Sequence, residues 1–119
     1  MAFFADLSAF EYAPQPELRG ALNVGWLARG ERFATGRTTA AFREKLRALC
    51  ASPAIRHRGF HTCEFGLCRF VERWAARGNG VIVVEGGGKR YAAPTLIYHY
   101  VTRHRYLPPP EFIDAVTKP

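Results

Sequence analysis

The fold of this chain is organised by a segment that reads Val81-Ile82-Val83-Val84-Glu85-Gly86-Gly87-Gly88-Lys89-Arg90-Tyr91-Ala92. Its run of β-branched residues favours an extended strand. The three glycines that follow suit a tight turn, because glycine adopts positive φ angles without strain. A second extended stretch begins directly after them, so the segment predicts a β-hairpin.

Two further strands are predicted on the N-terminal side of the hairpin. Residues 21–27 read Ala-Leu-Asn-Val-Gly-Trp-Leu, and a two-residue period places Leu22, Val24 and Trp26 on one face. Residues 56–65 form the other candidate strand. Before both lies a stretch rich in aromatic residues, and prolines end it. We expect residues 1–16 to form an irregular arm that packs on the core; its aromatic residues are Phe3, Phe4, Phe10 and Tyr12.

Apolar residues that recur at helical spacing predict four helices. The first begins after an N-cap at Thr38 or Thr39 and ends near Cys50; the others cover residues 67–76, about 94–104 and 111–116. These elements together predict an α+β fold, in which a small, mostly antiparallel sheet of about four strands has helices packed on one face. With 119 residues, the chain is expected to form a single domain over residues 1–119.

The formal net charge of +7 raises the question of nucleic-acid binding. Basic residues are scattered from Arg19 to Lys118 without a block of like charge, so the pattern disfavours nucleic acid as a partner. No segment has the apolar length of a membrane span, and the N-terminus lacks the pattern of a secretion signal. Three cysteines cannot all pair within the chain. We therefore expect a cytoplasmic protein with reduced thiols and no membrane partner.

Metal or thiol chemistry is credible in one segment, Arg58-Gly59-Phe60-His61-Thr62-Cys63-Glu64-Phe65-Gly66-Leu67-Cys68. If it begins as a strand, His61 and Cys63 share a face and Cys68 returns from the following turn. Imidazole and thiolate groups are ligands that zinc prefers. A fourth ligand would come from Cys50, His99 or a carboxylate such as Glu64. The alternative is that the cysteines are small buried hydrophobic residues and His61 is hydrogen-bonded at a sheet edge.

Two more histidines fall on the helix predicted after the hairpin. Five residues of helix rotate the chain by about 140°, beyond whole turns, so we expect at most one of His99 and His104 to join a metal site. His104 shares the apolar face of that helix and is expected to be a hydrogen-bonded core residue. The candidate metal ligands are therefore His61, Cys63, Cys68 and His99, with zinc as the candidate cofactor.

The whole-chain pattern resembles a family of uncharacterised bacterial proteins, mostly of one domain, which is catalogued as a domain of unknown function. The resemblance rests on Phe4-Ala5-Asp6-Leu7-Ser8, Leu22-Asn23-Val24-Gly25-Trp26-Leu27, Gly59-Phe60-His61-Thr62-Cys63-Glu64 and Tyr91-Ala92-Ala93-Pro94-Thr95-Leu96-Ile97-Tyr98-His99-Tyr100-Val101. It implies no activity. Relatives often have a cysteine three residues after the one that matches Cys63, and here that position is Gly66.

Three classes of function remain open. A protein-interaction or regulatory module without catalytic activity is favoured first, because the chain has no set of catalytic motifs and is rich in aromatic residues; Glu64, Tyr98 and Arg103 are its candidate surface. A structural or sensory zinc protein is the alternative. The third class is a thiol-dependent enzyme that uses Cys63, which would need a base or a lowered pKa. We assign no catalytic residue, and another protein is the expected partner.

Overall fold

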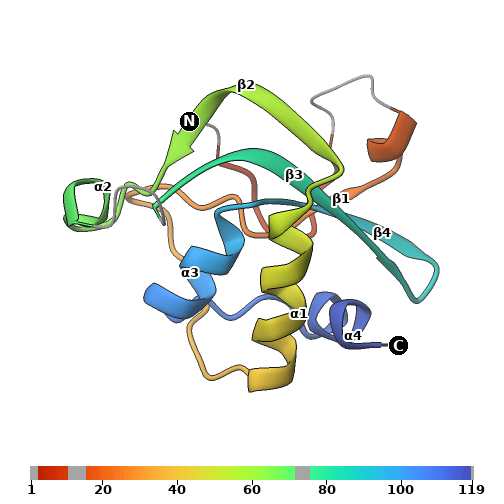
Figure 1. Ribbon diagram of the computed structural model, residues 1–119. Helices are drawn as coiled ribbons and strands as arrows, with labels where there is room; N and C mark the ends of the chain where they lie inside the picture. The colour runs from red at the N-terminus through yellow and green to blue at the C-terminus, as the bar shows by residue number, and fades with distance from the viewer. Residues whose placement is uncertain (1–2, 11–15, 72–75, 119) are drawn as a thin grey trace.

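The computed structural model describes residues 3–10, 16–71 and 76–118 (Figure 1). Within these ranges the chain forms a four-stranded sheet with the order β1-β4-β3-β2. The strands are β1 (Leu22–Asn23), β2 (Ile55–Thr62), β3 (Arg77–Gly86) and β4 (Lys89–Pro94). β1 runs parallel to β4, whereas the pairs β3–β4 and β2–β3 are antiparallel. The predicted α+β class with a mostly antiparallel sheet is confirmed.

The hairpin between β3 and β4 forms where the sequence predicts it. Gly86 pairs with Lys89, which leaves Gly87 and Gly88 as the loop. Their φ angles are 61° and 78°, both in the left-handed region. A two-residue hairpin turn whose twist matches that of the strands requires two positive φ angles. Glycine adopts such angles without strain.

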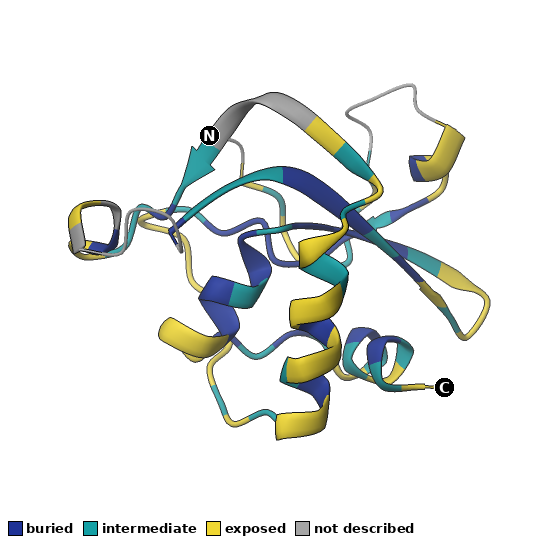
Figure 2. Cartoon of the chain, in the orientation of Figure 1, coloured by how far each residue is buried: buried dark blue, intermediate teal, exposed yellow. Residues whose placement is uncertain are grey.

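Successive residues of β3 enter two different cores, one on each face of the sheet. Ile82 and Val84 belong to the larger core, whereas Val81 and Val83 contact the smaller one. Three helices cover the larger core: α1 (Ala40–Ala51), α3 (Ile97–Arg103) and α4 (Pro110–Thr117). They lie together below the sheet in Figure 1, and Figure 2 shows the outward side of α1 as exposed. The prediction that helices pack on one face is confirmed.

The smaller core lies on the opposite face, and the N-terminal segment covers it. Trp26 is at its centre, with the rings of Phe4 and Phe10 packed against the indole at centroid distances of 5.4 and 6.1 Å. The indole Nε1 donates a 3.0 Å hydrogen bond to the carbonyl of Ala92. A short 3-10 helix, η1 (Pro16–Leu18), contributes the buried Leu18. The predicted arm residue Tyr12 lies outside the described residues.

Residues 21–27 depart from the single strand that the sequence suggests. Leu22 and Val24 contact the larger core but Trp26 enters the smaller one, so the prediction of one shared face is wrong. Gly25 causes the change, because its φ of 80° interrupts the two-residue alternation. Its amide donates to Asp6 Oδ1 at 3.0 Å, which fixes the bend. The extended segment therefore crosses from one side of the sheet to the other.

The other predicted helices are present with shifted bounds. Helix α2 (Cys68–Val71) is short, and residues 72–75 of the predicted helix lie outside the described residues. Pro94 ends β4 instead of opening a helix, and α3 begins at Ile97. Helix α4 extends over the predicted residues 111–116. Among the described residues, none of the helices combines the length and the apolarity needed to cross a bilayer.

Thr39 is the N-cap of α1, and its hydroxyl accepts a 3.1 Å hydrogen bond from the amide of Phe42. We expect Thr39→Ala to lower the free energy of unfolding by about 1 kcal/mol, because the amide loses its partner at the helix end. Urea denaturation followed by circular dichroism measures the change. Thr39→Ser keeps an acceptor at the same place and should retain most of the stability. An equal loss in both variants would contradict the role of the cap.

Candidate metal centre

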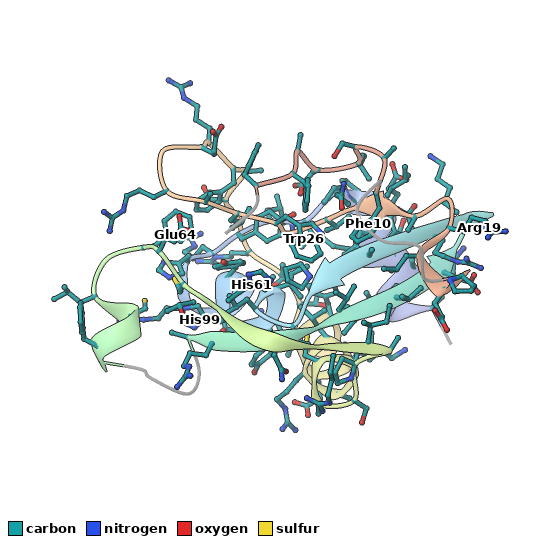
Figure 3. The ribbon with its side chains drawn as sticks, turned by 90° about the horizontal axis from the view of Figure 1, so that it is seen from above. Phe10, Arg19, Trp26, His61, Glu64 and His99 are labelled. Atoms are coloured by element: carbon teal, nitrogen blue, oxygen red, sulfur yellow. The ribbon has the colours of Figure 1, made fainter. Side chains whose placement is uncertain are left out.

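Four side chains of the types that can bind a metal ion converge beyond the end of β2. They are Cys63, Cys68, His99 and His104, and their ligand atoms all lie within 4.8 Å of one another. Cys63 follows the last residue of β2, and Cys68 opens α2. His99 lies on α3, and His104 is the C-cap of that helix. The cluster thus joins the loop after β2 to the end of α3, and Figure 3 shows His99 on this side of the molecule.

The spacing of His104 from the two cysteines suits a tetrahedral ion. His104 Nε2 lies 3.3 Å from Cys63 Sγ and 3.3 Å from Cys68 Sγ. Zinc bonds of about 2.3 Å to sulfur and 2.0–2.1 Å to nitrogen, at tetrahedral angles, separate the two ligand atoms by about 3.5 Å. His104 and the cysteines therefore already stand close to the separation that zinc requires.

Local backbone geometry turns both sulfurs inward. The amide of Cys63 donates to the carbonyl of Ala76 at 2.8 Å, which holds the loop beside β3. Two residues on, the amide of Phe65 donates to Cys63 Sγ at 3.5 Å. Gly66, with φ of 58°, then reverses the chain so that Cys68 comes back toward Cys63. An amide that donates to sulfur favours the thiolate, the form that binds metals.

The end of α3 brings the two histidines together. Their ring centroids are 5.2 Å apart, so the prediction that only one of them can join a site is wrong. Its premise was a continuous helix, but α3 ends at Arg103, and His104 has φ of −113° and ψ of 6°. A rotation of about 100° per residue holds only while the helix continues. The sequence does signal a stop near here, and that stop could have freed His104 from the helical rule.

The cluster is shielded from water. Cys63 is 1% exposed, Cys68 6% and His99 5%, while His104 is half-buried. The ring of Phe65 lies 5.2 Å from that of His104 and 5.9 Å from that of Tyr100. Phe65 and Tyr100 thus form an aromatic wall beside His104. Burial raises the pKa of the Tyr100 hydroxyl, and the charges of Cys63 and Glu64 raise it further. Electrostatic interactions are strong in such a dry environment.

His61 and Glu64, two residues that the sequence singles out, lie outside this cluster. The ring of His61 stands edge-on to Trp26 at 6.3 Å, and Figure 3 shows the two side by side. Glu64 Oε1 accepts a 2.9 Å hydrogen bond from the amide of Arg29, and its carbonyl accepts another from Arg29 Nε at 3.1 Å. Glu64 therefore fastens the cysteine loop to the loop after Trp26.

The remaining candidates, Cys50, Tyr98 and Arg103, are not members of this four-residue cluster. Cys50 is half-buried near the end of α1, where burial raises the pKa of its thiol to about 12. At neutral pH that thiol is protonated and reacts slowly. Tyr98 is half-buried against the larger core, and Arg103 is exposed. As a functional surface, Glu64, Tyr98 and Arg103 stay a prediction.

Fold and cluster together define a small α+β domain with a Cys2His2 group that could hold a metal ion. The chain belongs to the family described as "Domain of unknown function (DUF7919)", whose family model matches residues 2–117. A search of curated proteins and a search of solved structures each found no match.

Proposed function

We propose that this domain binds one zinc ion through Cys63, Cys68, His99 and His104, and that the ion has a structural role. The observation that carries the proposal is the convergence of four ligand atoms within 4.8 Å, from two segments far apart in the sequence. Three of the four side chains are buried, where polar groups need partners. A bound ion would provide one partner for all of them.

The ligand types support zinc. Thiolate and imidazole favour zinc over the hard cations calcium and magnesium, which prefer oxygen. Two thiolates balance the two positive charges of the ion, so the core would contain no net charge. Four protein ligands fill a tetrahedral shell, whereas catalytic zinc sites keep a position open for water. The arrangement therefore favours a structural ion.

The other two classes of function have weaker support. The 3.3 Å separation of Cys63 Sγ and His104 Nε2 would also suit a thiolate activated by an imidazole, as in a thiol enzyme. A nucleophile must meet its substrate, and a side chain that is 1% exposed is poorly placed for that. An interaction role rested partly on the aromatic arm, but Phe4 and Phe10 pack on Trp26. Metal binding is therefore our first proposal.

Metal content provides the direct test. Untagged protein, purified without chelator and dialysed, should contain one zinc per chain by elemental analysis. Cobalt exchanged into the site should give the intense visible bands of tetrahedral coordination and a sulfur-to-cobalt charge-transfer band. Protein that neither retains zinc nor takes up cobalt after chelator treatment would overturn the proposal.

Single replacements identify the ligands. We expect Cys68→Ser and His104→Ala to reduce zinc from one ion per chain to well below one, because each removes a ligand. Cys50→Ser and His61→Ala are matched controls that should keep a full ion. Loss of zinc from His61→Ala, with zinc kept in His104→Ala, would replace the proposed ligand set by the one that the sequence alone suggested.

Thiol reactivity gives an independent readout at neutral pH. With zinc bound, none of the three cysteines should react quickly with an alkylating reagent. After chelation Cys63 and Cys68 should become reactive, because loss of the ion would loosen the loop that buries them, whereas Cys50 should stay slow because its pKa is raised to about 12. Unchanged reactivity of Cys63 and Cys68 on chelation would contradict metal ligation by the thiols.

A further inference from the structure

A hollow of about 330 Å³ lies between the start of α1 and the end of α3, apart from the metal ligands. Its polar lining consists of arginine and threonine side chains: Arg37, Thr38, Arg43, Thr102 and Arg105. Every charged residue that lines it is an arginine. The hollow is thus a concave site with a strongly positive lining.

Two of the three arginines are available to a ligand. Within the part of the chain that the structure describes, the guanidinium groups of Arg37 and Arg105 make no ion pair or hydrogen bond. Arg43 is held in place, because its Nη1 donates to the carbonyl of Thr38 and, at 3.1 Å, to the Thr38 hydroxyl. One arginine is therefore positioned and the other two have free donors, which together favour an anion.

The backbone at Arg105 is unusual and firmly held. Its φ of 57° lies in the left-handed region, which costs a residue with a Cβ atom about 1–2 kcal/mol. The carbonyl of Arg105 accepts a 3.0 Å hydrogen bond from the amide of Gly36, and the amide of Leu107 donates to the carbonyl of Ala34 at 2.9 Å. These contacts join the segment after α3 to the segment before α1. They hold Arg105 beside Gly36, which precedes Arg37 in the chain.

A second basic hollow lacks this arrangement. It is lined by Arg19, Lys89 and Arg90, but also by Glu85. Arg90 is already bound there, to the Glu85 carboxylate at 2.8 Å and to the carbonyl of Arg19 at 3.2 Å. Its charge is thereby neutralised in part. The arginine hollow between α1 and α3 is the better anion site.

We propose that this hollow binds a phosphate group, either as inorganic phosphate or as the phosphate of a small phosphomonoester. The planar guanidinium fork matches two phosphate oxygens at once, and the Thr38 hydroxyl, which accepts from Arg43, can donate its proton to another. The start of α1 adds the partial positive charge of a helix N-terminus. A volume of about 330 Å³ is at the lower end of the range for small-molecule sites. The proposal does not depend on the zinc site.

Calorimetric titration with inorganic phosphate and with glycerol phosphate, at constant ionic strength, tests this site and distinguishes the two sources. At least one of the two should bind saturably with one site per chain; tighter binding of the ester would identify a phosphomonoester ligand. We expect Arg105→Gln and Arg43→Gln to weaken binding about tenfold or more, because each removes charged hydrogen bonds. Arg47→Gln removes the same charge from an exposed position on α1 and should leave the affinity unchanged.

Circular dichroism and urea denaturation separate a lost site from a lost fold. The spectrum and the unfolding midpoint should be unchanged in Arg105→Gln, because the Arg105 side chain is exposed. Failure of both phosphates to bind saturably would overturn the proposal. So would an equal loss in Arg47→Gln, which would mean that the general positive charge attracts the anion. Saturable binding of a single-stranded oligonucleotide, weakened by Arg47→Gln as much as by Arg105→Gln, would replace the phosphate site by a diffuse nucleic-acid surface.

Discussion

Cys63→Ser is expected to remove the bound zinc and to lower the free energy of unfolding by about 4 kcal/mol when free zinc is a thousand times its dissociation constant. The reason is linkage, because an ion that binds the folded chain and not the unfolded one stabilises the fold by its binding free energy. Cys63 is 1% exposed and its sulfur lies 3.3 Å from His104 Nε2, so its loss also breaks the contact at the centre of the cluster. Urea denaturation of zinc-loaded protein measures the loss.

The same experiment in chelator separates the ion from the packing. Without zinc the wild type loses the stabilisation that metal binding provides. The difference in the free energy of unfolding between wild type and Cys63→Ser should then shrink to about 1 kcal/mol or less. Cys50→Ser should respond to chelator as the wild type does. If chelator leaves the stability of the wild type unchanged while Cys63→Ser still costs several kcal/mol, the cysteine is a packing residue only.

Gly25→Ala is expected to lower the free energy of unfolding by about 2–5 kcal/mol. A side chain at φ of 80° is strained, at a cost of about 1–2 kcal/mol. The added Cβ would also lie 2.8 Å from Ile97 Cδ1, and overpacking of this kind costs about 1–3 kcal/mol. Ile97 opens α3, two residues before His99, so relief of the clash would shift the start of that helix. Thermal and urea denaturation measure the change.

Gly30 provides the matched control for this substitution. Its φ is 89°, but no atom lies within 4 Å of the position that a Cβ would take. Gly30→Ala should therefore show the backbone strain alone, about 1–2 kcal/mol. The excess in Gly25→Ala then measures the contact with Ile97. Equal losses in the two variants would show that α3 yields to the methyl group without cost.

The parts of the fold that local sequence determines could be predicted. The glycine turn of the hairpin and the Thr39 cap of α1 each depend on residues within a few positions of one another. The change of face at Gly25 could not be read in this way, because it depends on a bend held by Asp6 and on close packing against Ile97. Those partners are distant in sequence, and a two-residue period carries no information about them.

The same distinction, between local sequence and contacts of distant residues, applies to the candidate site. Cys63, Cys68 and His99 could be proposed from residue type and spacing, and the structure brings these three together. His104 takes the place expected for His61, because α3 ends just before His104. The ring of His61 packs against Trp26 instead, a contact that the strand pattern does not reveal. An alternating strand pattern says which face a side chain is on. It does not say that Trp26 occupies that face.

The four proposed ligands come from the two ends of one long segment. Cys63 and His104 are 41 positions apart, and the whole β3–β4 hairpin lies between them. An ion that stayed on these residues in the unfolded chain would close the segment into a ring, as a disulfide does. For a ring of this size the chain-entropy model predicts that the unfolded state is destabilised by about 4 kcal/mol. In that case the metal would stabilise the fold by reducing the number of conformations that the unfolded chain can adopt.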